Sequence, residues 1–413
     1  MNRFLEKTIT WIVQQEGKKF LSLSEGYNSS IHANKENNAK VSSLYIHIPY
    51  CRVLCPYCSF NRYLYNESEA KSYFNALKKE TDLYKDFGYE FTHLYIGGGT
   101  PTVNMDLLIS FISYVKSIFD VQQISMETNP SDLNVATIQQ LTDMNVKRLS
   151  IGVQSFNDEL LREMGRFSHT ATIAKEAVLR AKGHFDTVNI DLMFNFPSQT
   201  IESFEDDIRA FKNLGIEQVT FYPLMPSPHK KTKLEQQFNQ IKTNQEYAFY
   251  QFLLGEMIPE YSISTAWCFS KGNKIIDEYI IEDEDYVGIG AGAVSFLNGT
   301  FLVNTFSPQK YIEMLNHNQP PIIKSKKSSK RDYARYSLLT NLFGMKMDMK
   351  KHGDKFQNIL WWEILALRIF GIVKIDGNFL CTTRKGMYYI GIMMKNFFAT
   401  LNHLREFCIE RKL

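Results

Sequence analysis

Short runs of apolar and β-branched residues alternate with helical patterns from about residue 44 to residue 222 of this chain. The helical patterns include Glu69–Phe87, with its apolar residues on one face, and Phe204–Leu214. Such alternation is typical of parallel strands joined by crossover helices, and it predicts an α/β fold with six β/α units, an incomplete (β/α)6 barrel. The six strands are predicted at Leu44–Ile48, His93–Ile96, Ile124–Glu127, Arg148–Gly152, Val188–Leu192 and Gln218–Tyr222.

The alternation fades after residue 222, where a turn-rich closing segment surrounds Gly288–Ala293. The polar run Lys324–Arg331 is interpreted as a linker. Beyond it we expect a small helical, winged-helix-like domain made of a helix at Phe356–Phe370, a hairpin at Ile372–Thr382 and a helix at Lys385–Leu404. The chain is therefore divided into an N-terminal arm (1–40), the barrel (41–260), a closing segment (261–323) and a C-terminal domain (324–413).

Composition narrows the class of protein. The 413 residues are 44% hydrophobic, enough for a sizeable core, and 47 Lys and Arg against 44 Asp and Glu give a formal charge of only +3, which does not indicate polyanion binding. The apolar residues near the N-terminus are interrupted by Glu6 and Lys7, unlike a signal peptide. No stretch reaches the roughly 18 apolar residues of a membrane-spanning helix, so we expect a cytoplasmic protein.

Three of the six cysteines, Cys51, Cys55 and Cys58, crowd into eight positions directly after the first predicted strand. Iron–sulfur cubanes are normally held by four cysteine thiolates, so three ligands would leave one iron open to a small chelating molecule. The alternative is a zinc site completed by His47, but no second Cys or His pair stands at zinc-site spacing. We expect the scattered cysteines Cys268, Cys381 and Cys408 to be buried or inert thiols.

Polar residues or glycines also stand at the ends of the following strands. Barrel enzymes build their sites at the carboxyl ends of strands, so these positions predict one rim together with the cysteine loop. Each residue alone could instead be a helix cap, a tight turn or a satisfied core group. The rim positions are Gly97, Gly98, Gly99 and Thr100, then Glu127, Gln154 and Asp191.

The C-x3-C-x2-C spacing followed by the aromatic Phe60 resembles the signature of the radical S-adenosylmethionine (SAM) superfamily. In that superfamily the three cysteines hold a [4Fe–4S] cluster, and the fourth iron binds the amino and carboxylate groups of SAM. Electron transfer from the cluster then cleaves SAM to a 5′-deoxyadenosyl radical. The resemblance implies both cofactors and a low-potential electron donor such as flavodoxin or ferredoxin.

From about residue 40 to residue 300 the chain resembles the oxygen-independent coproporphyrinogen III oxidase and haem chaperone family. The matching motifs are Tyr45–Pro49, Gly97–Thr102, Glu127 with Pro130, Arg148–Phe156 and Ile190–Met193. The resemblance implies that the Gly97–Gly99 segment, followed by Thr100, binds the methionyl amine of SAM near Tyr45 and Glu127. By the same resemblance Tyr57 flanks the adenine, and the contacts to the ribose and carboxylate region come from Gln154, Arg166 and Asp191.

Members of this family decarboxylate coproporphyrinogen III, deliver haem, or open and methylate the haem ring. A flat tetrapyrrole with carboxylate arms needs aromatic walls and cationic clamps, for which Phe221, Tyr222, Lys230, Lys231 and Lys233 are candidates, although the lysines also fit a solvated loop.

Three features separate these activities. The well-studied oxidase has a fourth cysteine where this chain has Phe60, as in the chaperone and ring-opening members. The His-Asn-x-x-Tyr-Trp segment of the chaperone is absent, since this region reads Ile263–Cys268. More than forty residues precede the first strand, as in the oxidase. Taken together, these three features favour an oxidase-like enzyme that decarboxylates propionates oxidatively. The alternatives are a haem chaperone and a haem-modifying methyltransferase.

A different class of function is nucleic-acid binding by the winged-like domain together with the Lys324–Arg331 run. The charge of +3 and the lack of a Lys/Arg stripe along one helix favour a packing lid instead.

Overall fold

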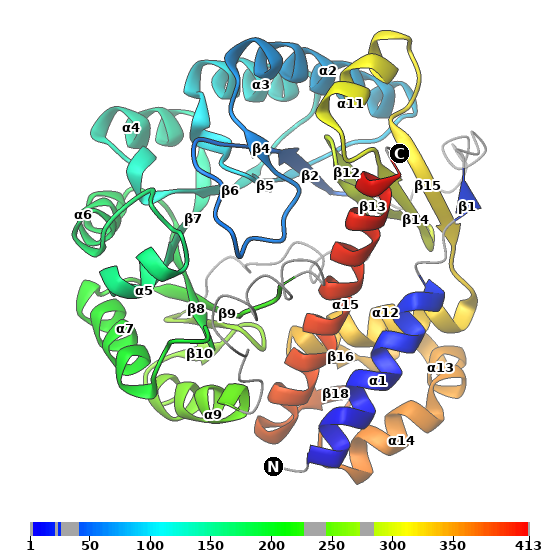
Figure 1. The fold of residues 1–413 in the computed structure, drawn as a ribbon. Coiled ribbons are helices and arrows are strands. Elements are labelled where there is room, and N and C mark those ends of the chain that lie inside the picture. Colours follow the sequence, from blue (N-terminus) through cyan, green and yellow to red (C-terminus); the bar gives the residue numbers. More distant parts are fainter. Residues whose placement is uncertain (1–2, 21–23, 26–40, 227–244, 273–284, 412–413) are drawn as a thin grey trace.

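The computed structural model describes residues 3–20, 24–25, 41–226, 245–272 and 285–411. Its centre is one open, curved sheet in which six parallel strands follow one another in chain order (Figure 1). All six lie where the sequence predicts strands, so the incomplete barrel is confirmed. They are β2 (Ser43–Ile48), β5 (His93–Gly98), β6 (Gln123–Thr128), β7 (Val146–Gln154), β8 (Thr187–Phe194) and β9 (Gln218–Pro223).

Crossover helices cover the outer face of this sheet (Figure 1). The first of them shows why the sequence folds this way: Asn66 caps it by accepting from the Glu69 backbone N–H, and its apolar face, with Tyr73 and Leu77, is buried. The crossover helices are α2 (Glu67–Asp86), α3 (Met105–Ile118), α4 (Val135–Asp143), α5 (Asp158–Glu163), α6 (Ala171–Ala181) and α7 (Ile201–Leu214). Two further helices, α9 (Glu246–Met257) and α11 (Pro308–Asn316), lead into antiparallel strands.

Shorter strands extend the sheet at both edges. Next to β2, and parallel to it, lies β12 (Tyr286–Ile289), and antiparallel strands continue outward from it. They are β13 (Val294–Leu297), β14 (Thr300–Asn304), β15 (Ile322–Lys327) and β1 (Ser24–Glu25). The other edge carries β11 (Cys268–Ser270) and β10 (Ser262–Ile263).

The interpretation of Lys324–Arg331 as a linker is wrong. Its first half belongs to β15, which pairs with β14 on one side and β1 on the other, and its second half starts helix α12 (Lys330–Phe343). Lys324 is only 5% exposed because it lies inside this antiparallel sheet. Polar composition therefore did not indicate a break in the structure.

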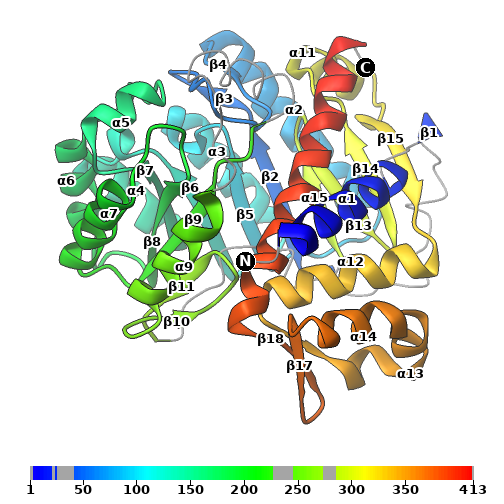
Figure 2. The same cartoon turned by 60° about the horizontal axis from the view of Figure 1, so that its bottom comes forward.

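The last part of the chain forms a small unit with a three-stranded sheet (Figure 2). The predicted hairpin is confirmed, and it turns at Gly377, whose φ of 58° favours glycine. The predicted helix Phe356–Phe370 is instead two helices that meet at Leu360. The elements after α12 are β16 (Lys346–Asp348), α13 (Met349–Ile359), α14 (Trp361–Ile369), β17 (Val373–Asp376), β18 (Phe379–Thr382) and α15 (Arg384–Glu410).

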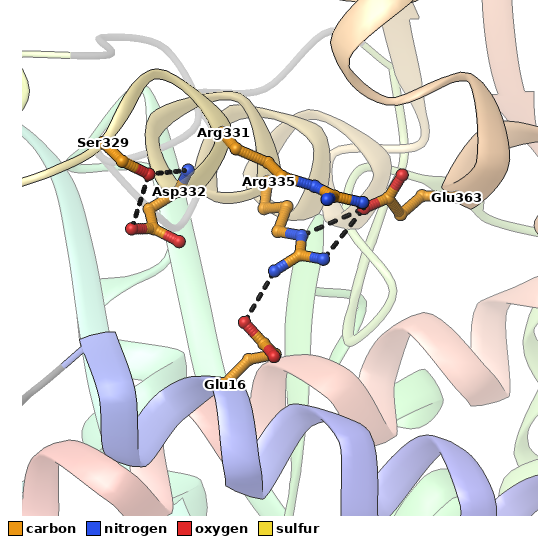
Figure 3. Close-up of polar contacts among 6 residues, drawn as sticks. All are labelled: Glu16, Ser329, Arg331, Asp332, Arg335 and Glu363. Atoms are coloured by element: carbon orange, nitrogen blue, oxygen red, sulfur yellow. Dashed lines mark hydrogen bonds and ion pairs between the residues drawn. The ribbon is translucent and has the colours of Figure 1, made fainter.

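Helix α15 returns from this unit across the open side of the curved sheet, and the N-terminal helix α1 (Arg3–Phe20) packs along it (Figures 1 and 2). Arg335 of α12 joins α1 to α14, with an ion pair to Glu16 at 2.6 Å and another to Glu363 at 2.9 Å (Figure 3). Arg331 shares the Glu363 carboxylate at 2.8 Å. Partly exposed pairs of this kind stabilise little, but they link α1, α12 and α14 to one another. None of the helices in the described ranges is long and apolar enough to cross a membrane.

Candidate functional site

A cavity of about 300 Å³ lies at the carboxyl ends of the parallel strands, next to the cysteine loop. It brings together most of the residues that the sequence nominates, from several different strands and loops. Gly97 and Thr100 are not part of its lining, although Thr100 donates to Cys51 Sγ at 3.5 Å. The nominated residues that line it are Tyr45, Cys51, Cys55, Tyr57, Cys58, Gly98, Gly99, Glu127, Gln154, Arg166 and Asp191.

The cysteine loop begins in the short strand β3 (Tyr50–Cys51), which pairs with β4 (Tyr63–Leu64). Cys51 and Cys55 are buried, Cys58 is partly buried, and none of the three is part of a disulfide. Burial raises the pKa of Cys51 to about 11, and a bound metal would replace the thiol proton and favour the thiolate. No three His, Cys, Asp or Glu side chains in the described ranges gather around a single metal ion; a cubane instead binds each cysteine to a different iron.

His47, the candidate fourth zinc ligand, is engaged at both ring nitrogens. Its Nε2 lies 2.8 Å from the carbonyl oxygen of Asn61, and its Nδ1 lies 2.8 Å from the hydroxyl of Tyr45. Because a carbonyl only accepts, Nε2 carries the proton and Nδ1 accepts from Tyr45. Burial lowers the pKa of His47 to about 4, so the ring is neutral. These contacts argue against zinc and give His47 the role of orienting Tyr45 in the cavity.

The glycine run permits close packing behind and beside the cavity. A Cβ on Gly97 would lie 2.9 Å from the Glu127 carboxylate, and one on Gly98 would lie 2.7 Å from the His47 ring. Gly98 also has a φ of 113°, which side chains rarely adopt. The run therefore lets the backbone at Gly98 and Gly99 face the cavity directly, as expected for a segment that binds a ligand through its main chain.

Two carboxylates stand beside this backbone. Glu127 accepts from the Tyr95 hydroxyl at 3.0 Å and from the Gly98 N–H at 3.2 Å. Burial, with a smaller contribution from the nearby Asp191 carboxylate, raises the pKa of Glu127 to about 7. Asp191 itself accepts from the hydroxyl of Ser150 at 2.9 Å. A cationic group in the cavity would favour the ionised form of both carboxylates.

Gln154 is held in an unusual conformation at the end of β7. Its φ is 72°, and the pairing of β7 with β8 shifts register between Gly152 and Gln154. The two residues that follow Gln154 are held by the buried carboxylate of Asp207 on α7. This carboxylate accepts from the Ser155 hydroxyl at 2.8 Å and from the Phe156 N–H at 2.6 Å. Non-glycine residues stay in the left-handed region only when surrounding contacts hold them there, and such positions cluster at functional sites.

Arg166 contacts the cysteine loop rather than open solvent. Its Nη1 donates to Cys55 Sγ at 3.4 Å, and its Nη2 donates to Asn129 Oδ1 at 2.6 Å and to the Gly152 carbonyl at 2.7 Å. Its buried Nε has no hydrogen-bond partner among the described residues. Arg166 therefore places a positive charge between the cysteine loop and the ends of β6 and β7.

An apolar wall lines part of the cavity, and Tyr222 belongs to it as predicted; two of its members, Met193 and Leu224, pack against Cys55 of the cysteine loop. Phe221 does not: the prediction is wrong, because alternation along β9 points Phe221 into the core, where it packs against Phe204 and Phe269. The lysines 230, 231 and 233 lie outside the described residues. The wall consists of Phe60, Met193, Tyr222, Leu224, Met225, Trp267 and Phe398.

Several lining residues escaped the sequence reasoning. Arg62 could have been found, since it lies four positions after Cys58 in the same loop. Tyr95 follows from strand alternation, since it lies four residues before the lining residue Gly99. Phe398 and Asn402 come from the distant helix α15 and leave no local signal in the sequence.

The residues present fit a [4Fe–4S] cluster with bound SAM in two respects. Three cysteines outside any disulfide and an adjacent guanidinium suit an anionic cluster. Bare backbone at Gly98 and Gly99, flanked by the carboxylates of Glu127 and Asp191, suits a cationic amino acid.

Comparison with known proteins agrees with this chemistry. The sequence model of the radical SAM superfamily matches residues 45–226. The chain is 31% identical to the haem chaperone HemW of Bacillus subtilis over 67% of this chain and 76% of that protein, and 31% identical to HemW of Escherichia coli over 64% and 73%. It is 24% identical to the oxygen-independent coproporphyrinogen III oxidase of Escherichia coli, over 84% and 83%.

The fold comparison covers nearly the whole molecule. The structure of coproporphyrinogen III oxidase from Escherichia coli, a radical SAM enzyme, matches with a TM-score of 0.76 and 22% identity, over 91% of this chain and 95% of that chain. The chain therefore belongs to the radical SAM superfamily, in the family of haem chaperones and oxygen-independent coproporphyrinogen III oxidases, whose cofactors are a [4Fe–4S] cluster and SAM.

Proposed function

We propose that this protein acts in haem metabolism by binding a tetrapyrrole next to a cluster-bound SAM. The observation that carries the proposal is a single cavity with two chemically different sides. One side holds the three cysteines and the polar rim, and the other is the apolar wall that includes Tyr222, Trp267 and Phe398. A SAM molecule fits the first side by charge, and a flat aromatic ring fits the second.

The polar side divides into a cluster site and a SAM site. Cys51, Cys55 and Cys58 would hold the cluster as thiolates. The ammonium of SAM would lie against the Glu127 carboxylate and the Gly98–Gly99 backbone, with Gln154, Asp191 and Arg166 toward the ribose and carboxylate. When bound, the cluster and SAM together supply a 5′-deoxyadenosyl radical, and a flavodoxin or ferredoxin is a suitable electron donor.

The chain's own residues prepare this site for radical chemistry. Tyr45, oriented by His47, and the buried ring of Tyr57 enclose the polar side. Helix α15 adds Phe398 to the cavity lining, and a tetrapyrrole bound against it would displace water from the space beside the SAM site. Exclusion of water protects a reactive intermediate from side reactions.

Haem is the tetrapyrrole that we propose first. Relatives that are about 31% identical are named haem chaperones, whereas the oxidase relative is 24% identical. Phe60 occupies the position of the fourth cysteine of the oxidase and is 62% exposed at the edge of the cavity, where it could contact a porphyrin face. We therefore rank a haem chaperone ahead of an oxidase, which reverses the order that the sequence alone favoured.

Oxidative decarboxylation of coproporphyrinogen III is the second candidate. It is favoured by the segment Ile263–Cys268, which lacks the His-Asn-x-x-Tyr-Trp pattern of the chaperone and instead places Trp267 in the cavity wall. In that reaction the 5′-deoxyadenosyl radical would take a hydrogen atom from a propionate β-carbon, and loss of carbon dioxide and of one electron to an acceptor would leave a vinyl group.

One anaerobic experiment separates the candidates. Reconstituted protein is reduced with SAM and either haem or coproporphyrinogen III, and products are identified by mass. A chaperone binds haem stoichiometrically and leaves both tetrapyrroles unchanged, whereas an oxidase gives 5′-deoxyadenosine and a product lighter by carbon dioxide and two hydrogen atoms for each propionate converted. Failure to bind either tetrapyrrole would refute the proposal. A Cys55→Ala variant is the control for cluster-dependent products.

A further inference from the structure

Helix α15 connects the small C-terminal unit to the cysteine loop. It has 27 residues and, at 1.5 Å per residue, is about 40 Å long. Phe398, Asn402 and Arg405 follow at positions i, i+4 and i+7, so they share one face of the helix. The first two line the cavity, and the third reaches the loop that carries the cysteines.

Arg405 is buried and donates a hydrogen bond to the loop next to its last cysteine. Its side chain is 8% exposed, and its Nη1 donates to the carbonyl oxygen of Ser59, the residue after Cys58. The Arg405 Nε is also buried and has no hydrogen-bond partner among the described residues. Burial lowers the pKa of Arg405, and the Cys58 thiol is close enough to act on it in the opposite direction.

Two other guanidiniums share this arrangement. Arg62 donates to the carbonyls of Cys55 and Cys58, and Arg166 donates to the Cys55 sulfur. All three arginines have a buried Nε without a partner in the described part of the chain, and none forms an ion pair with a described carboxylate. Burying cations without counter-charges is unfavourable, so the cluster of arginines indicates that an anionic group belongs among them.

A cubane held by three thiolates is such a group. It is negatively charged, and it gains one more negative charge when it is reduced. A fixed positive charge nearby therefore stabilises the reduced form more than the oxidised form. Arg62 and Arg166 belong to the same α/β unit as the cysteines, whereas Arg405 comes from the C-terminal helix.

We propose that Arg405 is a positioning residue for the iron–sulfur cluster, through which helix α15 holds the cysteine loop closed and raises the reduction potential of the cluster. The inference rests on the proposed cofactor but not on the identity of the tetrapyrrole. The C-terminal unit is then part of the redox site as well as a cover for the cavity.

The simpler alternative is that Arg405 only connects α15 to the cysteine loop and has no effect on the cluster. It predicts that loss of Arg405 destabilises the protein but leaves the potential of any assembled cluster unchanged. The charge hypothesis predicts that the folded apoprotein tolerates the loss and that the potential moves. The reduction potential therefore discriminates between the two.

The test compares Arg405→Gln and Arg405→Met, which remove the charge, with Arg405→Lys, which keeps it. Arg411→Gln is the matched control, because it removes an exposed arginine directly after the same helix. Each full-length protein is reconstituted anaerobically, its iron and sulfide are counted, and its cluster is titrated against redox dyes by electron paramagnetic resonance. Loss of iron to a chelator is followed in parallel.

Both neutral variants should keep the wild-type circular dichroism, lose iron faster, and show an equilibrium constant for reduction about tenfold lower, which is about 59 mV for one electron. Arg405→Lys should restore most of the potential, and Arg411→Gln should match the wild type. An unchanged potential in the neutral variants, or loss of fold in both, would overturn the inference. If the wild-type protein itself assembles no cluster, the cofactor assignment fails instead.

Discussion

The affinity for SAM should depend on pH through Glu127. Among the described residues this carboxylate accepts hydrogen bonds from Tyr95 and Gly98, while burial and the nearby Asp191 carboxylate raise its pKa to about 7. An ammonium group placed against it would favour the ionised form. SAM binding below pH 7 should therefore release a proton from Glu127.

The size of the effect follows from the fraction of Glu127 that is ionised before binding. With a pKa of about 7, that fraction rises from about 9% at pH 6 to about half at pH 7. If only the ionised form binds SAM well, the Kd falls about fivefold over this interval, which is about 1 kcal/mol. The direction is fixed, since a raised carboxyl pKa means that binding improves as the pH rises toward 7.

Isothermal titration of SAM into the anaerobically reconstituted protein measures this dependence. Two buffers with different ionisation enthalpies reveal the proton that is released. Glu127→Gln keeps the shape of the side chain and removes the titration, so it should bind SAM more weakly at pH 7 and with little change between pH 6 and pH 7. An equally steep dependence in Glu127→Gln, or a flat one in the wild type, would refute the reasoning.

Three further substitutions probe the site. Asp207→Ala leaves buried donors unpaired and frees Gln154 from its strained conformation, so SAM affinity should fall roughly tenfold at unchanged iron content; unchanged affinity would contradict this. Gly98→Ala forces a Cβ against His47, and chemical denaturation should show a loss of roughly 2–4 kcal/mol. Phe398→Ala should weaken haem binding about three- to tenfold in an absorbance titration without affecting SAM.

Local patterns predicted the parallel half of the fold well. Each buried strand from β2 to β9 is a short apolar run bounded by turn residues, and a local pattern of that kind is readable without tertiary information. The rim followed from it, because parallel strands end at one edge. Glu127, Gln154 and Asp191 were found in this way.

The remainder depended on contacts between distant segments. Lys324 is buried because β14 and β1 pair on either side of β15, and nothing in a run of lysines and serines indicates such pairing. The contribution of α15 was hidden for the same reason, since Phe398 and Arg405 become site residues only when the helix packs back across the sheet. Phe221 was misassigned because alternation, rather than residue type, decides which face of β9 meets the cavity.

The central claim is that Cys51, Cys55 and Cys58 hold a cubane whose fourth iron is open to SAM. Electron paramagnetic resonance of the reduced, reconstituted protein with and without SAM tests it most directly. We predict a [4Fe–4S] signal that changes shape when SAM is added and that is absent from Cys55→Ala. A signal that saturating SAM leaves unchanged, or a wild-type protein that assembles no cluster, would contradict the account.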